Sequence, residues 1–228
     1  MVIPTYNEKD NIGLLLEQIF SLGISDLSVL VVDDNSPDGT AEVAEEYGRK
    51  FPIRVLRRPK KQGIGKAYAE GFKKVLLEKP DFIIQMDADF SHDPRVIPRF
   101  LEKIKNCDLV LGSRYIPGGG IENWNWLRRF ISYSGNLYAR LILGVKIKDL
   151  TGGFKCFRRE VLEKINLKDL NSVGYCFQIE TTYKILKKGF RVCEIPITFT
   201  ERRIGASKFN LGIILESFIK VFLMRFHG

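Results

Sequence analysis

Short apolar runs alternate with helical patterns along the first half of the chain, and this alternation constrains the fold more than any other feature. The runs cover residues 2–3, 27–32, 53–57, 82–86 and 108–112, and the helical patterns between them cover residues 11–22, 40–50, 65–77 and 94–105. Strands that alternate with helices connect by right-handed crossovers into a mostly parallel sheet with helices on both faces. We therefore predict an α/β fold.

The second half of the chain has a less regular pattern. Residues 117–126 read as a loop rich in Gly and aromatic residues, and residues 149–157 as a loop followed by a strand. Helical patterns cover residues 127–143, 178–188 and 208–226, and a further strand pattern covers residues 191–199. Pro196 lies inside that strand and favours an edge or irregular position. No linker separates the two halves, so we predict one domain over residues 1–228.

The charge of the chain predicts an anionic partner. The sequence of 228 residues carries a formal net charge of +9, and 45% of its residues are hydrophobic, which is enough for a sizeable core. Nucleic acid, a phosphorylated substrate and an anionic lipid all fit such a charge. Because the basic residues are not clustered with aromatic residues on a groove-reading element, we do not expect nucleic acid.

The cysteines give no sign of a metal or disulfide framework. Cys107, Cys156, Cys176 and Cys193 are scattered without paired spacing, which argues against a zinc ribbon and against disulfides, and suits a reducing compartment. We expect each to be a small buried apolar side chain. The sequence shows neither a signal peptide nor a run of about 18–20 apolar residues that would span a membrane.

Two carboxylates follow the apolar run of residues 82–86. Asp87 and Asp89 lie at its carboxyl end, where open α/β sheets bind ligands. Side chains at positions i and i+2 of a strand share a face, and two such carboxylates repel each other unless a cation lies between them. Mg²⁺ or Mn²⁺ bridging phosphates fits these oxygens. The alternative is a strand end followed by a helix that Asp93 caps.

Two further clusters follow the first two strands. In the first, Tyr6 is suited to stack on a base and Glu8 to accept hydrogen bonds from a base or ribose; alternatively, the segment is a loop that caps the next helix. In the second, Asp33 and Asp34 end a buried strand, and an aspartate there can accept N–H bonds from a nucleobase. The alternative for the second cluster is a turn with a helix cap at Asp38 or Thr40.

Cationic side chains follow the later elements. Arg114 comes just after the strand of residues 108–112, and Arg128 and Ser132 lie four residues apart on one helix face, where they can hold a phosphate. Arg202 and Lys208 lie on a Gly-containing loop that suits a diphosphate. The alternatives are a solvated or membrane-facing patch for Arg128 and a plain surface loop for residues 201–208.

Taken in order, these motifs resemble the family 2 glycosyltransferases of the GT-A fold, and most of all the polyprenyl-phosphate glycosyltransferases, the group of dolichyl-phosphate mannose synthase. The likeness covers nearly the whole chain. The segments that carry it are residues 4–8, 33–40, 63–68, 87–89, 112–115, 149–154 and 202–208.

The resemblance implies a role for each site residue. The nucleoside pocket would be formed by Pro4, Tyr6, Glu8, Val32 and Asp34. Asp87 and Asp89 would hold Mg²⁺ or Mn²⁺ on the diphosphate beside Ala88. Ser91 stands where some family members carry a Gln ligand, so a water would take the place of that ligand. Arg202 and Lys208 would close over the diphosphate. The acceptor phosphate would be bound by Arg114, Arg128 and Ser132. Residues 1–112 would thus form the nucleotide- and metal-binding half, and residues 113–228 the acceptor-binding half.

The resemblance also implies a reaction. Mannose would pass with inversion from GDP-mannose to dolichyl or another polyprenyl phosphate. The alternatives are UDP-glucose or another sugar donor, a glycan hydroxyl as acceptor, and an inert module that binds a sugar nucleotide or a membrane surface. A phosphate is already anionic, so it needs a general base less than a hydroxyl does. Asp149 is the first candidate for a base or orienting group, and Glu180 ranks behind it because Lys184 lies one turn away.

A lipid acceptor implies a peripheral protein on the cytoplasmic face of a membrane. The helices of residues 127–143 and 208–226 are apolar with basic flanks, so either can lie in the interface of an anionic bilayer or simply pack on the core. Some relatives carry transmembrane helices after this domain. We therefore expect a soluble-domain form, a truncated form, or a partner of a membrane-anchoring subunit.

Overall fold

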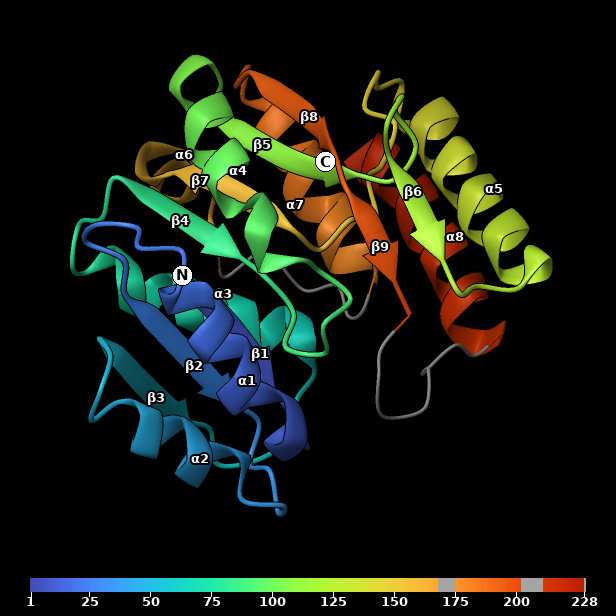
Figure 1. Cartoon of the computed structure of the whole chain (residues 1–228). Helices are drawn as coiled ribbons and strands as arrows, with labels where there is room; N and C mark the ends of the chain where they lie inside the picture. The colour runs from blue at the N-terminus through green and yellow to red at the C-terminus, as the bar shows by residue number, and fades with distance from the viewer. Residues whose placement is uncertain (168–174, 202–210, 228) are drawn as a thin grey trace.

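A seven-stranded sheet forms the centre of the molecule in the computed structural model, which describes residues 1–167, 175–201 and 211–227 (Figure 1). The strands run in the order β3-β2-β1-β4-β7-β5-β8. Their bounds are β1 (Val2–Thr5), β2 (Val29–Asp33), β3 (Ile53–Arg57), β4 (Phe82–Gln85), β5 (Leu109–Ser113), β7 (Lys155–Arg158) and β8 (Val192–Pro196). Only β7 runs antiparallel to its neighbours, β4 and β5. The predicted, mostly parallel α/β sheet is confirmed.

Helices cover both faces of this sheet. The helices α1 (Lys9–Phe20), α2 (Thr40–Tyr47) and α4 (Ile97–Lys103) pack on one face, and α3 (Ile64–Leu76), α6 (Arg159–Lys164) and α7 (Tyr175–Lys187) pack on the other. Successive strand residues point to opposite faces, so Val2 joins the core on the α3 side and Ile3 joins the core on the α1 side. Short 3₁₀ turns flank α4, so the helix predicted over residues 94–105 is interrupted at both ends.

The remaining elements lie at one end of the molecule. Helices α5 (Trp126–Leu143) and α8 (Leu211–His227) pack side by side, and the Tyr138 hydroxyl donates to the Phe218 carbonyl oxygen (Figure 1). A two-stranded sheet joins β6 (Gly120–Glu122) to β9 (Thr198–Thr200). Strand β6 falls in the segment predicted as a loop, because three residues are too few to show a strand pattern. Among the described helices, none has the length and apolarity needed to cross a bilayer.

One prediction about the cysteines is wrong. Cys107 and Cys193 form a disulfide across 86 positions of sequence, whereas Cys156 and Cys176 are buried thiols outside any disulfide of the described residues. The sequence hides the pair because the two residues meet only through the sheet. Strand β5 begins two residues after Cys107 and pairs in parallel with β8, which contains Cys193. Pro196 ends β8 at the edge of the sheet, as its ring requires.

The loops that follow β1, β2 and β4 meet at one edge of the sheet. The register pairs Thr5 with Asp33, so the segments that follow these two residues lie side by side. Each loop turns through a residue with left-handed backbone: Asn7 (φ 59°), Asn35 (φ 60°) and Phe90 (φ 59°). This conformation is strained for a bulky residue such as Phe90, and strain of this kind concentrates at functional sites.

Candidate active site

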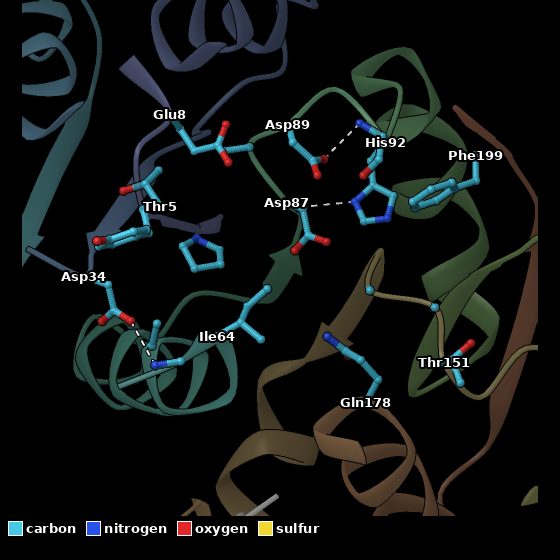
Figure 2. A pocket seen from close by; sticks show the side chains of 18 of the residues that line it. Thr5, Glu8, Asp34, Ile64, Asp87, Asp89, His92, Thr151, Gln178 and Phe199 are labelled. Atoms are coloured by element: carbon cyan, nitrogen blue, oxygen red, sulfur yellow. Dashed lines mark hydrogen bonds between the residues drawn. The ribbon is translucent and has the colours of Figure 1, made fainter. Parts of the chain in front are cut away.

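A cavity of about 440 Å³ opens at this edge of the sheet (Figure 2). Its walls come from the loops after β1, β2, β4 and β5, from the start of α3, and from α5 and α7. It brings together ten of the residues predicted for the site: Pro4, Tyr6, Glu8, Asp34, Asp87, Ala88, Asp89, Ser91, Arg114 and Arg128. Four of the predicted carboxylates, Glu8, Asp34, Asp87 and Asp89, therefore share one cavity with two of the predicted cations.

Asp87 and Asp89 lie at the centre of the cavity wall (Figure 2). The Tyr68 hydroxyl of α3 donates to Asp87 Oδ1 at 2.7 Å, and the Ser91 backbone N–H donates to Asp89 Oδ1 at 3.1 Å. The left-handed backbone of Phe90 forms the turn between Asp89 and Ser91. These contacts hold both carboxylates in fixed positions at the end of β4.

This pair of carboxylates suits a hard divalent cation. Ser91 Oγ is buried near them and has no hydrogen-bond partner in the part of the chain that the structure describes. A buried hydroxyl without a partner destabilises a fold, so one in a native structure points to a ligand that the hydroxyl contacts. Two carboxylates and a hydroxyl are the oxygen donors that Mg²⁺ and Mn²⁺ prefer. Asp93 does cap the turn that follows, as the alternative stated, since it accepts from the Arg95 N–H at 2.9 Å, but this cap does not involve Asp87 or Asp89. The residues present therefore fit the cation.

His92 fixes the Asp87 backbone through a hydrogen bond. Its Nδ1 accepts from the Asp87 N–H at 3.2 Å, so the neutral ring carries its proton on Nε2. Burial lowers the pKa of His92, although the charges of Asp87 and Asp89 oppose this shift. The ring also stacks on Phe154, with centroids 5.0 Å apart. His92 is thus a rigid neutral support for the carboxylate loop.

At one end of the cavity, Asp34 holds the loop of residues 58–63. Its Oδ1 pairs with the Arg58 guanidinium, and its Oδ2 accepts from the backbone N–H groups of Gln62 and Gly63 at 3.1 and 3.0 Å. Asp34 lines the cavity as predicted, but its carboxylate is largely occupied by protein donors. Val32 does not line the cavity, because its side chain packs in the core against α3.

Tyr6 and Glu8 form the rest of this end. The Lys61 ammonium lies 3.5 Å from the centroid of the Tyr6 ring, which is close enough for a cation–π contact. The Glu8 carboxylate accepts from Asn11 Nδ2 at 2.8 Å. An aromatic face, an ammonium and a carboxylate are together suited to a nucleoside, which offers a flat base and ribose hydroxyls.

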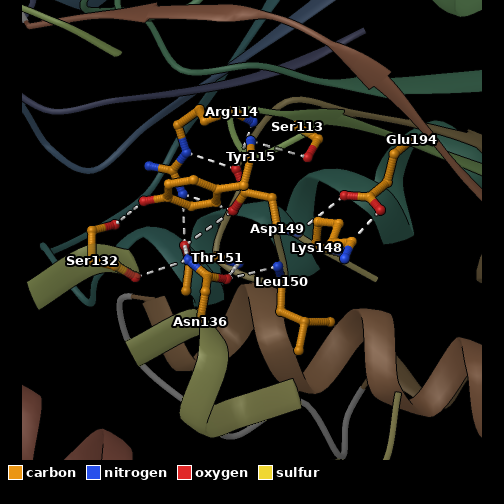
Figure 3. A network of polar contacts seen from close by, with 10 residues as sticks. All are labelled: Ser113, Arg114, Tyr115, Ser132, Asn136, Lys148, Asp149, Leu150, Thr151 and Glu194. Carbon is orange, nitrogen blue, oxygen red and sulfur yellow. Dashed lines mark hydrogen bonds and ion pairs between the residues drawn. The ribbon is translucent and has the colours of Figure 1, made fainter. Parts of the chain in front are cut away.

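Arg114 anchors a buried polar network at the opposite end (Figure 3). Its Nε and Nη2 donate to the two carboxylate oxygens of Asp149 at 2.7 Å each, and Nη2 also donates to Thr151 Oγ1 at 2.6 Å. Burial alone would raise the pKa of Asp149, but the charge and hydrogen bonds of Arg114 outweigh it and leave this pKa below its usual value. Asp149 is fully buried, and it does not line the cavity. Its carboxylate orients Arg114.

The same network reaches helix α5. Asn136 Nδ2 donates to Thr151 Oγ1, and Asn136 Oδ1 accepts from the Leu150 N–H (Figure 3). The Tyr115 hydroxyl donates to Ser132 Oγ at 2.8 Å. Ser132, predicted to bind the acceptor phosphate, is therefore engaged with Tyr115 and lies outside the cavity wall. One turn earlier on α5, Arg128 does reach the cavity.

Arg128 is held between two partners. Its guanidinium carbon lies 4.0 Å from the centroid of the Trp124 ring, and Nη1 pairs with the Glu201 carboxylate. Arg114 also lies near this ring, at 5.9 Å. The two cations and the indole thus form one wall, which is suited to an anionic ligand. Arg202 and Lys208, predicted to cover the diphosphate, lie outside the described residues.

The cavity also contains residues that the sequence did not single out. Thr151 lines the cavity, whereas Tyr68 lies outside its wall and contacts Asp87 through its hydroxyl. Both residues lie within the recognised motifs, but neither was given a role. His92, Trp124, Gln178 and Phe199 carry no local signal, since only the fold brings them to the cavity. Glu180, the second candidate for a general base, does not line the cavity, and Lys184 donates to it at 2.7 Å.

Comparison with known proteins places the chain in a family. The model of the family described as glycosyl transferase family 2 matches residues 1–166. The chain belongs to glycosyl transferase family 2. As a member of family 2 it is a glycosyltransferase, as the resemblance of its motifs predicted.

Two relatives within family 2 are similar over nearly the whole chain. The polyprenol monophosphomannose synthase of Mycolicibacterium smegmatis is 44% identical over 224 residues, which cover 97% of this chain and 84% of that protein. The undecaprenyl-phosphate mannosyltransferase of Micrococcus luteus is 42% identical over 221 residues, which cover 96% of this chain and 90% of that protein.

Solved structures confirm the fold predicted for this family 2 member. The chain is similar to glucosyl-3-phosphoglycerate synthase from Mycobacterium tuberculosis in complex with Mn²⁺, UDP-glucose and phosphoglyceric acid, with a TM-score of 0.71 and 18% identity. The match covers 98% of this chain and 78% of that one. At this identity the likeness shows the GT-A fold alone.

Proposed function

We propose that the protein transfers mannose from GDP-mannose to a polyprenyl phosphate, with inversion at the anomeric carbon. The two relatives above are named for mannosyl transfer to polyprenyl phosphates, and they are similar over almost the entire chain. The cavity supports the proposal because it combines a nucleoside end, a pair of carboxylates and a cationic wall. GDP and dolichyl or another polyprenyl chain are the donor and acceptor that we infer from the resemblance.

The position of Asp149 is the observation that carries the choice of a phosphate acceptor. A sugar hydroxyl needs a base to take its proton, but Asp149 and Glu180 both lie off the cavity wall, and Asp149 is ion-paired with Arg114. A phosphate arrives as an anion and needs no such base. Arg114 and Arg128 supply the positive charge that it does need. The same arrangement counts against a glycan hydroxyl as acceptor.

The transfer would be a single displacement. An oxygen of the lipid phosphate attacks the anomeric carbon, and the bond from that carbon to the nucleoside diphosphate breaks with its electron pair. Arg114 and Arg128 hold the attacking phosphate, and Tyr6 and Glu8 hold the nucleoside. Asp87 and Asp89 would hold Mg²⁺ or Mn²⁺, which when bound neutralises charge that develops on the diphosphate leaving group. Tyr68 and Ser91 keep these two carboxylates in place.

The lipid acceptor implies that the protein works at a membrane surface. Among the side chains that the structure describes, α5 and α8 form a patch of exposed large apolar residues: Trp126, Leu127, Phe130, Tyr133, Leu137, Leu141, Ile219, Phe222, Leu223 and Phe226. Amphipathic helices of this kind lie in the headgroup region of a bilayer with their basic residues on anionic lipids. We infer that this peripheral surface lies on the cytoplasmic face of the membrane, with a membrane-anchoring subunit as a further partner.

A transfer assay tests the function. Purified protein with Mn²⁺ and a short polyprenyl phosphate receives GDP-mannose or UDP-glucose in parallel reactions. We expect a lipid product from GDP-mannose alone, and none from a folded Asp89→Ala variant. Product from UDP-glucose alone would keep the acceptor and replace the donor. Tight nucleotide binding without any lipid product would contradict the proposed acceptor.

A further inference from the structure

Gln178 is a polar side chain in the cavity to which neither the sequence motifs nor the mechanism above gives a role. It lies on α7, is 4% exposed, and points from the floor of the cavity towards Asp87 (Figure 2). Its backbone carbonyl accepts from the buried Lys155 ammonium at 2.9 Å. The residue is therefore fixed at its backbone, and its side chain enters the site from below.

The orientation of the Gln178 amide is set by a second buried amide. Gln85 Nε2 donates to Gln178 Oε1 at 2.8 Å and to the Gly153 carbonyl at 2.9 Å, and Gln85 is fully buried. Because Oε1 of Gln178 faces Gln85, its Nε2 faces the cavity. No described residue accepts a hydrogen bond from that nitrogen. The fold thus presents an oriented N–H donor to a ligand.

A glycine keeps the space in front of this donor open. A Cβ added at Gly153 would lie 3.2 Å from Asp87 Oδ2, 3.4 Å from His92 Cε1 and 3.6 Å from Gln178 Nε2. The Gln178 amide and the Asp87 carboxylate therefore border the same small space. A ligand group in that space is next to the carboxylate that would hold the cation.

We propose that Gln178 Nε2 donates a hydrogen bond to a hydroxyl oxygen of the transferred sugar, and that this contact helps to select the sugar. The inference rests on the proposed function and adds a specificity residue to it. The sugar is bonded to the diphosphate, so it must lie within a few ångströms of Asp87 and Asp89 when the diphosphate is bound there. The space over Gly153 meets that requirement.

The acceptor phosphate is a poorer match for this position. The space over Gly153 is bordered by Asp87, the His92 ring and the Gln178 amide, and none of these brings the positive charge that an acceptor phosphate needs. The cations suited to a phosphate, Arg114 and Arg128, gather instead around Trp124. A neutral amide next to a carboxylate offers a donor and an acceptor, which is the pair that a hydroxyl can use.

The test compares Gln178→Leu and Gln178→Glu with wild type on GDP-mannose and on its monodeoxy analogues. Gln178→Glu keeps an oxygen for Gln85 and replaces only the donor nitrogen. Gln18→Glu on the exposed surface of α1 is the control for the added charge. We expect kcat/KM with GDP-mannose to fall about 10- to 100-fold in both Gln178 variants, with GDP affinity and the KM for polyprenyl phosphate unchanged.

The deoxy series decides the matter. For one monodeoxy donor, we expect the kcat/KM of wild type to be about 10- to 100-fold lower than for GDP-mannose. Gln178→Leu should use that analogue and GDP-mannose equally well, and should still discriminate against the other monodeoxy donors as wild type does. Discrimination that is equal in wild type and variant at every position would overturn the proposal. So would a raised KM for polyprenyl phosphate with donor selectivity intact.

A second variant covers the case in which Gln178→Leu does not fold. Gly153→Ala fills the shared space with one methyl group and should retain GDP binding while it loses transfer. Unchanged transfer by Gly153→Ala would overturn the proposal. Wild-type protein that uses no nucleotide mannose would refute the proposed function and with it this inference, whereas active wild type with unchanged selectivity refutes the role of Gln178 alone.

Discussion

At the scale of single residues, Tyr68 is the clearest example of a side chain that acts through another. Its hydroxyl donates to Asp87 Oδ1, while its ring is fully buried and stacks near Phe72 and Phe177. Tyr68→Phe keeps the ring and removes only the hydrogen bond. Groups that orient a metal ligand typically change metal affinity about 10- to 100-fold, so we expect a loss of Mn²⁺ affinity in that range. Calorimetric titration with Mn²⁺ measures it.

The matched control for this change is Tyr47→Phe. The Tyr47 hydroxyl donates to Glu17 on the surface, and neither residue lines the cavity. Its removal should leave Mn²⁺ affinity as in wild type. Equal Mn²⁺ affinity in Tyr68→Phe and wild type would mean that Asp87 needs no such support, and the assignment of Asp87 as a metal ligand would lose its structural argument.

Arg128 gives a second prediction at this scale. If its guanidinium binds the acceptor phosphate, Arg128→Ala should raise the KM for polyprenyl phosphate about tenfold or more and leave the KM for GDP-mannose nearly unchanged, because a charge-assisted hydrogen bond is worth about 1.5–3 kcal/mol. Steady-state kinetics with each substrate varied in turn measures the two KM values. Arg129→Ala is the control, since Arg129 donates to the Ile121 carbonyl and does not line the cavity. An equal rise in both constants would contradict the role.

Residue types at strand ends were readable from the sequence, whereas hydrogen-bond partners were not. Asp87 and Asp89 could be placed because an apolar run ends just before them and parallel strands end at one edge. Ser132 was assigned by its spacing from Arg128, but the sequence does not show that Tyr115 occupies its hydroxyl. Asp149 and Gln178 depend on contacts between segments far apart in the chain, which a local pattern cannot show.

At the scale of elements, α5 and α8 form the surface that we expect at the membrane. Phe130 and Leu141 on α5 are 63% and 71% exposed, and Phe226 on α8 is 67% exposed. Replacing these three by Ser should abolish sedimentation with anionic vesicles, since each buried large apolar side chain contributes about 1.5–3 kcal/mol. Nucleotide binding in solution should stay as in wild type. The measurement is cosedimentation with phosphatidylglycerol vesicles.

The control for the triple variant removes an exposed apolar side chain elsewhere and leaves the α5 and α8 surface intact. Leu77 is also exposed, at 76%, but lies just after α3 and away from both helices, so Leu77→Ser should leave vesicle binding unchanged. Undiminished cosedimentation of the triple variant would show that α5 and α8 do not carry the protein to the bilayer. Their exposed side chains would then need another partner.

Helices and strands that are long enough to show a repeating apolar pattern were predicted close to their observed positions, whereas the shortest helices and strands were missed. Strand β3 lies at residues 53–57 as predicted, and α5 begins one residue before its predicted start. Strand β6 and helix α6 span three and six residues and were missed, because so few residues cannot display a period. The pattern over residues 191–199 was read as one strand, but β8 ends at Pro196 and β9 begins at Thr198, with Ile197 between them.

At the scale of the whole molecule, the sheet joins the two halves of the sequence. Strand β7 lies between β4 and β5, and the disulfide from Cys107 to Cys193 ties the edge strand β8 to the same region. A crosslink that closes a loop of this length stabilises a protein by about 2–5 kcal/mol. Reductant should lower the free energy of unfolding of wild type by that amount and leave a Cys107→Ser/Cys193→Ser variant unaffected. Urea unfolding with and without reductant measures this difference, and equal effects on both proteins would contradict it.

The buried Lys155 makes the stability of the whole fold depend on pH. Its ammonium is fully buried and donates to the Gln178 carbonyl and to Thr182 Oγ1. Burial lowers its pKa from 10.5 to about 7, although the charges of Asp149 and Asp87 oppose the shift. Below pH 7 both the folded and unfolded chains carry the proton, so the cost of the buried charge is present in full and constant. Between pH 7 and 10.5 the unfolded chain binds more protons, so stability rises with pH.

Lys155→Met isolates this contribution. The Gln178 carbonyl keeps a donor in the variant, since Thr182 Oγ1 also donates to it at 3.0 Å. We expect Lys155→Met to be more stable than wild type at pH 6, by a few kcal/mol at about 1.4 kcal/mol per pKa unit. This advantage should shrink steadily as the pH rises from 7 towards 10, because wild type then buries a neutral amine. Urea unfolding of both proteins across pH 6–10 measures the difference, in which the other titrating groups cancel. Parallel profiles would mean that Lys155 has the same pKa in the folded and unfolded chains.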